Sequence, residues 1–163
     1  MRFRNNILTR SVIALTMVSL ICQPLWACTG MTLRAKDGSV VFGRTLEWGS
    51  FDLKSRLVIV PRGYEYTSHL ENGQIGKNWK TKYGVVGLDV VEKDLIQDGM
   101  NEKGLSVNVF YHPGFAEYAT FELARAGNTL NSLDLCQYLL TTCATVDEAR
   151  KATAAVVPGC PGQ

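Results

Sequence analysis

The stretch Trp26-Ala27-Cys28-Thr29-Gly30 separates an apolar leader from a chain with β-strand patterning. A peptidase that cuts between Ala27 and Cys28 would leave a mature protein that begins with cysteine. That residue would carry a thiol and a free α-amine together. Because an α-amine has an unperturbed pKa of about 7.7–8.0, it can accept the thiol proton near neutral pH. The stretch therefore predicts a cysteine nucleophile that contains its own base.

Residues 1–27 have the pattern of a secretory signal. Three arginines and no acidic residue lie in residues 1–10, and residues 11–22 (SVIALTMVSLIC) are mainly apolar. A positive start, a short apolar run and a small residue before the cut are typical of exported proteins. The run is also shorter than the roughly 20 residues that cross a bilayer. We therefore expect a periplasmic or secreted protein without a stable membrane span, and a buried N-terminal helix is the alternative.

The basic character of the whole chain belongs to this leader. The chain has 17 Lys and Arg against 15 Asp and Glu, and removing the three leader arginines leaves 14 against 15, a net charge of −1. Basic residues do not cluster with aromatic ones, which argues against a nucleic-acid partner. Residues 28–163 have the length of one ordinary domain.

The spacing of the remaining cysteines predicts neither a disulfide framework nor a metal site. Cys136 and Cys143 lie seven residues apart in a helical pattern, roughly 10 Å along the axis, which exceeds the reach of a disulfide. The sequence contains no CxxC pair and no HExxH, and its two histidines are His69 and His112. We therefore expect no zinc or other metal site.

A hairpin is expected to follow the leader. Two β-rich runs, residues 28–34 and 39–48, flank Asp37-Gly38, which favours a tight turn because the turn needs a positive φ. Arg44 and Glu47 then lie on the returning strand or just past it. A guanidinium there would favour a thiolate, and a carboxylate could hold the α-amine. The alternative is an exposed cross-strand ion pair that contributes little.

The rest of the chain predicts strands first and helices afterwards. Further strands are expected at residues 56–61, 83–91 and 105–111, a loop that carries a surface histidine at 64–82, and an ordered turn at 97–104. Helical spacing begins at Asn131, and Thr145 to Glu148 form a capping box for a second helix that runs to about Ala155. Pro158 is expected to stop that helix, and residues 159–163 to be turn-like. This order indicates an α+β fold.

Four motifs, in order and with compatible spacing, resemble the choloylglycine hydrolase family. They are Cys-Thr-Gly at 28–30, Phe-Gly-Arg-Thr-Leu-Glu-Trp at 42–48, Pro-Arg-Gly-Tyr at 61–64, and Asp-Gly-Met-Asn-Glu-Lys-Gly-Leu at 98–105. The family comprises bile salt hydrolases and penicillin V acylases, which hydrolyse linear amides with an N-terminal cysteine. The likeness covers most of residues 28–114 and weakens into a generic helical pattern after them.

The resemblance implies a role for each of four residues. Cys28 would be nucleophile and base, and Arg44 would lie beside its thiol. Glu47 occupies a position where the family usually has aspartate, so its contact with the α-amine is displaced by about a bond length. Tyr111 stands where bile salt hydrolases usually have asparagine and penicillin V acylases tyrosine, which favours an acylase-like substrate. Its backbone N–H would form half of an oxyanion hole.

The resemblance also implies a four-layer αββα fold of the N-terminal-nucleophile type, of which residues 28–163 are the N-terminal portion. The second oxyanion donor, an asparagine, and a further arginine belong to the part of the family fold beyond Gln163. A small-molecule amide is the implied substrate, without a cofactor. We therefore expect a truncated hydrolase domain that is inactive by itself, and the full-length protein could be a homo-oligomer.

Two other interpretations compete with the amidase. Leu25-Trp26-Ala27-Cys28 is similar to a bacterial lipobox, whose cysteine is lipidated. A lipidated sulfur cannot attack an amide, so Cys28 would then anchor a non-catalytic envelope protein. The third interpretation is a degenerate fragment that neither folds nor acts.

Overall fold

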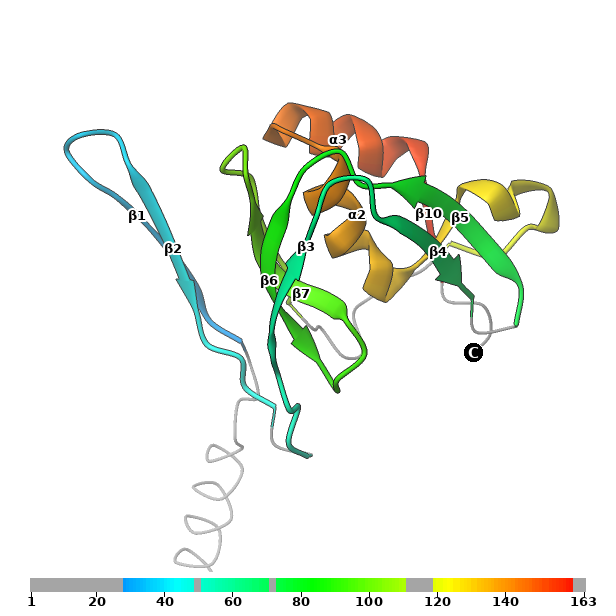
Figure 1. Cartoon of the computed structure of the whole chain (residues 1–163), viewed down its shortest axis with the longest axis horizontal. Helices are drawn as coiled ribbons and strands as arrows, with labels where there is room; N and C mark the ends of the chain where they lie inside the picture. Colours follow the sequence, from blue (N-terminus) through cyan, green and yellow to red (C-terminus); the bar gives the residue numbers. More distant parts are fainter. Residues whose placement is uncertain (1–27, 49–50, 71–72, 111–118, 160–163) are drawn as a thin grey trace, which may run out of the picture. The chain divides into compact units, whose positions relative to one another are not determined.

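The computed structural model describes residues 28–48, 51–70, 73–110 and 119–159. The chain divides into two compact units, residues 1–49 and residues 50–163. Figure 1 shows their helices and strands. In chain order these are β1 Gly30–Arg34, β2 Val40–Arg44, β3 Leu57–Val60, β4 Glu65–His69, β5 Ile75–Lys80, β6 Val85–Val90, β7 Leu95–Asn101, β8 Ser106–Asn108, the 3-10 helix η1 Leu123–Asn128, β9 Thr129–Asn131, the 3-10 helix η2 Ser132–Asp134, α2 Leu135–Thr142, α3 Val146–Ala155 and β10 Val157–Gly159.

The first unit contains the predicted hairpin. β1 and β2 pair antiparallel, with Gly30 opposite Arg44 at the open end. Gly38 adopts φ +87° in the turn, and the Asp37 carboxylate accepts the Ser39 N–H (2.9 Å) and hydroxyl (2.7 Å). Both bonds lower the pKa of Asp37, and the bond from the Ser39 hydroxyl has the larger effect. The Asp-Gly turn signal is confirmed, because a left-handed glycine and an aspartate side chain close the loop.

The second unit is organised around the antiparallel sheet β3-β6-β7-β8. The strands predicted at residues 56–61 and 83–91 are confirmed as β3 and β6, and the one predicted at 105–111 begins as β8. One face of the sheet packs against α2, and Figure 1 shows this helix beside the strands β3, β6 and β7. The shared core consists of Val60, Val85, Ile96, Cys136 and Leu140.

The other face of this sheet is apolar as well. Side chains alternate between the two faces of a strand, and the residues that point away from α2 are 45% to 76% exposed in the structure. They pair across the strands, Leu57 with Leu88 and Ile59 with Val86, and Val86 in turn with Met100.

Residues 65–69 and 75–80 are the two strands of a hairpin, so the loop predicted at residues 64–82 was wrong. β4 and β5 pair antiparallel, and Gly73 at φ +79° donates its N–H to the Leu70 carbonyl in the turn. Within the hairpin the Trp79 indole stacks on Tyr66 with a centroid distance of 5.1 Å, and its N–H anchors the hairpin to α2 by donating to the Thr141 hydroxyl at 3.0 Å. His69 is exposed at the end of β4.

The stretch predicted as a turn at residues 97–104 is mainly strand, so that prediction was also wrong. β7 continues to Asn101, and the turn is confined to the residues before Leu105, with Gly104 at φ +81°. The Asn101 amide donates to the carbonyls of Leu140 (2.8 Å) and Cys143 (2.6 Å), and its oxygen accepts the Leu105 N–H (3.1 Å). One side chain thus ties the β7–β8 turn to the end of α2.

Gly99 explains how closely β7 and α2 approach, and Gly87 how closely β6 and β7 approach. Gly87 and Gly99 lie directly opposite each other on β6 and β7. A Cβ on Gly99 would lie 2.9 Å from the Val86 carbonyl oxygen and 3.0 Å from Leu140 Cδ1. Gly99 is therefore required by packing within the sheet layer, whereas the sequence suggested that it was part of a turn.

The predicted helices are confirmed. Thr145 caps α3 by accepting the Glu148 N–H at 3.2 Å, and the Glu148 carboxylate accepts the N–H of Ala144 at 2.8 Å. α3 ends at Ala155, but the chain then forms β10, which pairs in parallel with β9. The expected turn at residues 159–163 is thus wrong for Gly159, and residues 160–163 lie outside the described residues.

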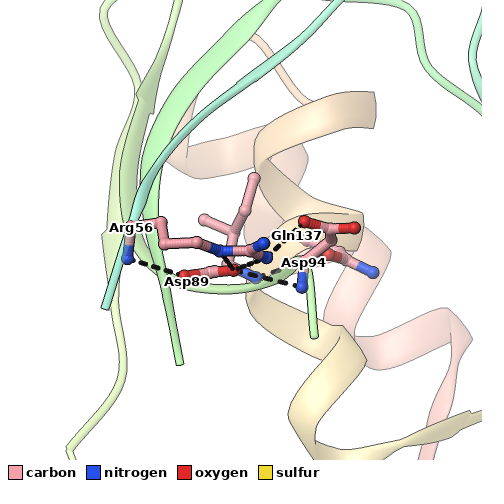
Figure 2. Close-up of polar contacts among 5 residues, drawn as sticks. Arg56, Asp89, Asp94 and Gln137 are labelled. Atoms are coloured by element: carbon pink, nitrogen blue, oxygen red, sulfur yellow. Dashed lines mark hydrogen bonds and ion pairs between the residues drawn. The ribbon is translucent and has the colours of Figure 1, made fainter. Parts of the chain in front are cut away.

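A charged cluster closes the β6–β7 connection, and Figure 2 shows it beside α2. The Asp89 carboxylate is fully buried and accepts the backbone N–H (2.8 Å), Nε (3.0 Å) and Nη2 of Arg56. Arg56 also bonds Asp94 (2.7 Å). The Arg56 side chain holds the pKa of Asp89 below its usual value. The cluster stabilises a connection in which Val91 and Glu92 adopt left-handed φ values of 54° and 57°.

Candidate functional site

Cys28 lies two residues before β1. Its side chain is half-buried, and its thiol is free. Cys28 therefore lies at the open end of the β1–β2 hairpin, where Gly30 is opposite Arg44, the last residue of β2. The prediction that Cys28 opens the first strand is correct to within two residues.

The pairing of the hairpin extends beyond the strands to the residue after the cysteine. The Thr45 N–H donates to the Thr29 carbonyl at 2.9 Å, which continues the register that pairs Gly30 with Arg44. Cys28 directly precedes Thr29, so the hairpin brings Cys28 and Arg44 to its open end.

The side chains of Arg44 and Glu47 both bind Thr45. Arg44 Nε donates to the Thr45 carbonyl at 3.2 Å. The Thr45 hydroxyl donates to Glu47 Oε1 at 2.9 Å and accepts the Thr29 N–H at 3.0 Å. The cation, the carboxylate and the backbone after Cys28 are therefore connected through one residue.

Thr45 is the residue that reasoning from the sequence missed. It stands in the quoted motif at 42–48, between the two residues that were given roles. The local signal did not give its place, because a two-residue Asp-Gly turn would set Thr29 opposite Leu46. The structure has a three-residue loop instead, since Ala35 pairs with Ser39, and this loop sets Thr29 opposite Thr45. Two facing threonines at the end of a hairpin favour hydrogen bonds between them.

Tyr111 lies outside the described residues, so its predicted place in the oxyanion hole stays a prediction. Among the residues that the structure describes, no three His, Cys, Asp or Glu side chains come together as a metal site would require. In the same part of the chain, no helix is both long and apolar enough to span a membrane.

The fold places the chain in a class of hydrolases. Penicillin V acylase from Agrobacterium tumefaciens superposes with a TM-score of 0.64 at 26% identity, over 82% of this chain and 40% of the acylase. The described residues thus form part of the α+β fold of N-terminal-nucleophile hydrolases. The profile of the linear amide C-N hydrolases, choloylglycine hydrolase family, matches residues 28–157, and the chain belongs to this family.

Two relatives in sequence represent the two activities of the family. Bile salt hydrolase/transferase of Clostridium perfringens is 28% identical over 127 residues, which are 77% of this chain and 37% of that protein. Penicillin V acylase of Pectobacterium atrosepticum is 29% identical over 156 residues, 92% of this chain and 40% of the acylase. The chain therefore spans about two fifths of the length of these relatives.

Proposed function

We propose that the protein is an exported hydrolase of linear amides whose nucleophile is the thiol of Cys28, freed as an N-terminal residue by removal of residues 1–27. The observation that carries the proposal is the open end of the β1–β2 hairpin. There Thr45 joins Arg44, Glu47 and the peptide that follows Cys28. Membership of the linear amide C-N hydrolases supports it.

The chemistry follows from the two groups on Cys28. The α-amine takes the thiol proton, and the sulfur attacks the amide carbonyl to form a tetrahedral intermediate. The amine then returns the proton to the leaving nitrogen as the C–N bond breaks and a thioester remains. Water attacks the thioester, with the α-amine as base, and releases the acid and the free thiol. Arg44 favours the thiolate by its charge, Glu47 holds the ammonium form, and the Tyr111 N–H is a donor to the oxyanion.

The substrate class is part of the proposal. The bile salt hydrolase and the penicillin V acylase among the relatives each cleave an amide that links an acyl group to a small polar amine. Conjugated bile salts, penicillin V and N-acyl homoserine lactones share that bond. Because the chain spans about two fifths of the relatives, the proposal concerns the protein that contains the remaining catalytic donors.

The test uses the exported protein purified with its native N-terminus. Hydrolysis of the three substrates is measured for the wild type, Cys28→Ala and Cys28→Ser. We expect Cys28→Ala to lose activity by about 10⁴-fold or more and Cys28→Ser to lose most of it. Activity retained in the alanine variant would overturn the mechanism.

The mass of the mature N-terminus separates this proposal from the lipid anchor. A free cysteine at position 28 agrees with the amidase. A diacylglycerol adduct on Cys28 would contradict it and support the non-catalytic envelope protein, because a thioether has no proton to lose and cannot attack a carbonyl.

A further inference from the structure

Thr45 connects the residues of the candidate site, yet neither the family assignment nor the chemical steps proposed above give its hydroxyl a role. We propose that Thr45 is a positioning residue, whose hydroxyl fixes the Cys28–Thr29 peptide and the Glu47 carboxylate relative to each other. This inference rests on the amidase proposed above and assigns no chemical step to Thr45.

The direction of the two hydroxyl bonds follows from the groups involved. An amide N–H can only donate, and an ionised carboxylate can only accept. The Thr45 hydroxyl therefore accepts from the Thr29 N–H at 3.0 Å and gives its proton to Glu47 Oε1 at 2.9 Å. A single hydroxyl satisfies both at once, so the positions of the two partners are coupled.

The bonds constrain Cys28 through its peptide. Thr29 is held on both sides, since its N–H reaches the Thr45 hydroxyl and its carbonyl accepts the Thr45 N–H at 2.9 Å. A peptide unit is planar, so fixing the Thr29 N–H also fixes the plane that contains the carbonyl carbon and Cα of Cys28. The orientation of the thiol and the amine is then left to the ψ and side-chain torsions of Cys28.

The same hydroxyl also restricts the position of the Glu47 carboxylate, whose side chain is one bond longer than that of aspartate. Glutamate has one more rotatable bond than aspartate, and ordering it costs additional conformational entropy. The bond from Thr45 selects one position of the carboxylate. The carbonyl of Thr45 also accepts Arg44 Nε at 3.2 Å, so the cation and the carboxylate take their positions from a single residue.

An alternative role for Thr45 is to stabilise the end of the hairpin without affecting catalysis. Its hydrogen bonds are exposed to solvent, and exposed bonds of this kind make only a small net contribution to stability. Such a role would alter the melting of the hairpin and leave the reactivity of Cys28 unchanged. The two roles therefore differ in what a variant does to the thiol.

The experiment compares Thr45→Val, which keeps the branched shape and removes the hydroxyl, with Thr45→Ser, which keeps the hydroxyl. Thr32→Val is the matched control, because it removes a threonine hydroxyl from the middle of β1. Each exported protein is assayed for kcat and KM on the amide that the wild type hydrolyses. The rate of alkylation of Cys28 by iodoacetamide is followed by mass spectrometry, with the buried Cys136 and Cys143 as internal references.

We expect Thr45→Val to lower kcat by about 10–100-fold with a much smaller change in KM, since misplacing a reacting group affects the transition state most. Alkylation of Cys28 should slow as well. Thr45→Ser should restore both to within a few-fold, and Thr32→Val should match the wild type. Hydrogen exchange at the Thr29 amide should accelerate in Thr45→Val, which reports the lost bond directly.

The outcomes separate the two proposals. If the wild type hydrolyses the amide and Thr45→Val does so equally well, the positioning role is wrong and the amidase stands. The same holds if Thr45→Ser is as impaired as Thr45→Val, because shape and not the hydroxyl would then matter. If the wild type itself cleaves none of the amides and its Cys28 alkylates no faster than the buried cysteines, both proposals are overturned.

Discussion

The β1–β2 hairpin and the layer of sheet and helix in residues 50–163 are stabilised by different means. In the layer, Ile96 and Leu140 are fully buried, and a continuous core joins the sheet to α2. In the hairpin, Leu33 and Val41 lie opposite each other and are each 61% exposed. None of the described residues of the hairpin belongs to a buried core cluster, and the candidate site is at the open end of this hairpin. Its geometry therefore depends on turn chemistry and hydrogen bonds, whereas the layer depends on packing.

The sharpest test of this difference is the removal of one leucine from each region. Leu140→Ala should lower the free energy of unfolding by about 3 kcal/mol, because it leaves a cavity between α2 and the sheet. Leu33→Ala removes the same atoms from the hairpin and should change it by less than about 0.5 kcal/mol. Urea denaturation followed by far-UV circular dichroism measures both. Equal effects would mean that the hairpin has a packed core of its own.

A smaller effect is expected from adding one methyl group to a strand in each region. Gly99→Ala forces a Cβ to within 2.9 Å of the Val86 carbonyl oxygen and 3.0 Å of Leu140 Cδ1. We expect it to cost about 2 kcal/mol, as overpacking does. A Cβ on Gly43 of β2 meets no atom within 4 Å. Gly43→Ala should therefore be neutral or slightly stabilising, and a loss comparable to that of Gly99→Ala would contradict the comparison. Thermal melts of the two variants provide the measurement.

The smallest expected effect comes from the local caps. Thr145→Ala removes the acceptor of the Glu148 N–H at the start of α3 and should lower the free energy of unfolding by about 1 kcal/mol. Asp37→Ala removes the corresponding acceptor in the hairpin turn. It should leave the unfolding of the layer unchanged and increase hydrogen exchange at Ser39. A cooperative loss in both regions would show that they unfold together.

The parts of the fold that could be predicted depend on local chemistry. Asp37-Gly38 closes the hairpin, and Thr145 caps α3, because turns and caps are encoded within four or five residues. The β4–β5 hairpin was missed, although Asn72-Gly73 is a turn signal, because its strands are mostly polar. They are held by Trp79, whose partners Tyr138 and Thr141 are about 60 residues away in sequence.

The stretch at residues 97–104 was misassigned for a similar reason. A glycine within a polar segment is typical of a turn, and nothing local reveals that Leu140 packs against Gly99. At the candidate site, the sequence predicted that the hairpin would bring Cys28, Arg44 and Glu47 to one end. It did not single out Thr45, because a threonine beside two charged residues has no distinctive pattern until the register is drawn.

The motif at residues 98–105 contributes to the family likeness, yet in the structure its contacts are architectural. Gly99 makes room for Leu140, Asn101 binds the end of α2, and Gly104 turns the chain. A variant without Cys28 would keep these three contacts for as long as it kept the sheet. The motif at residues 98–105 therefore reports on the fold alone, whereas the proposed activity depends on the residues at the open end of the β1–β2 hairpin.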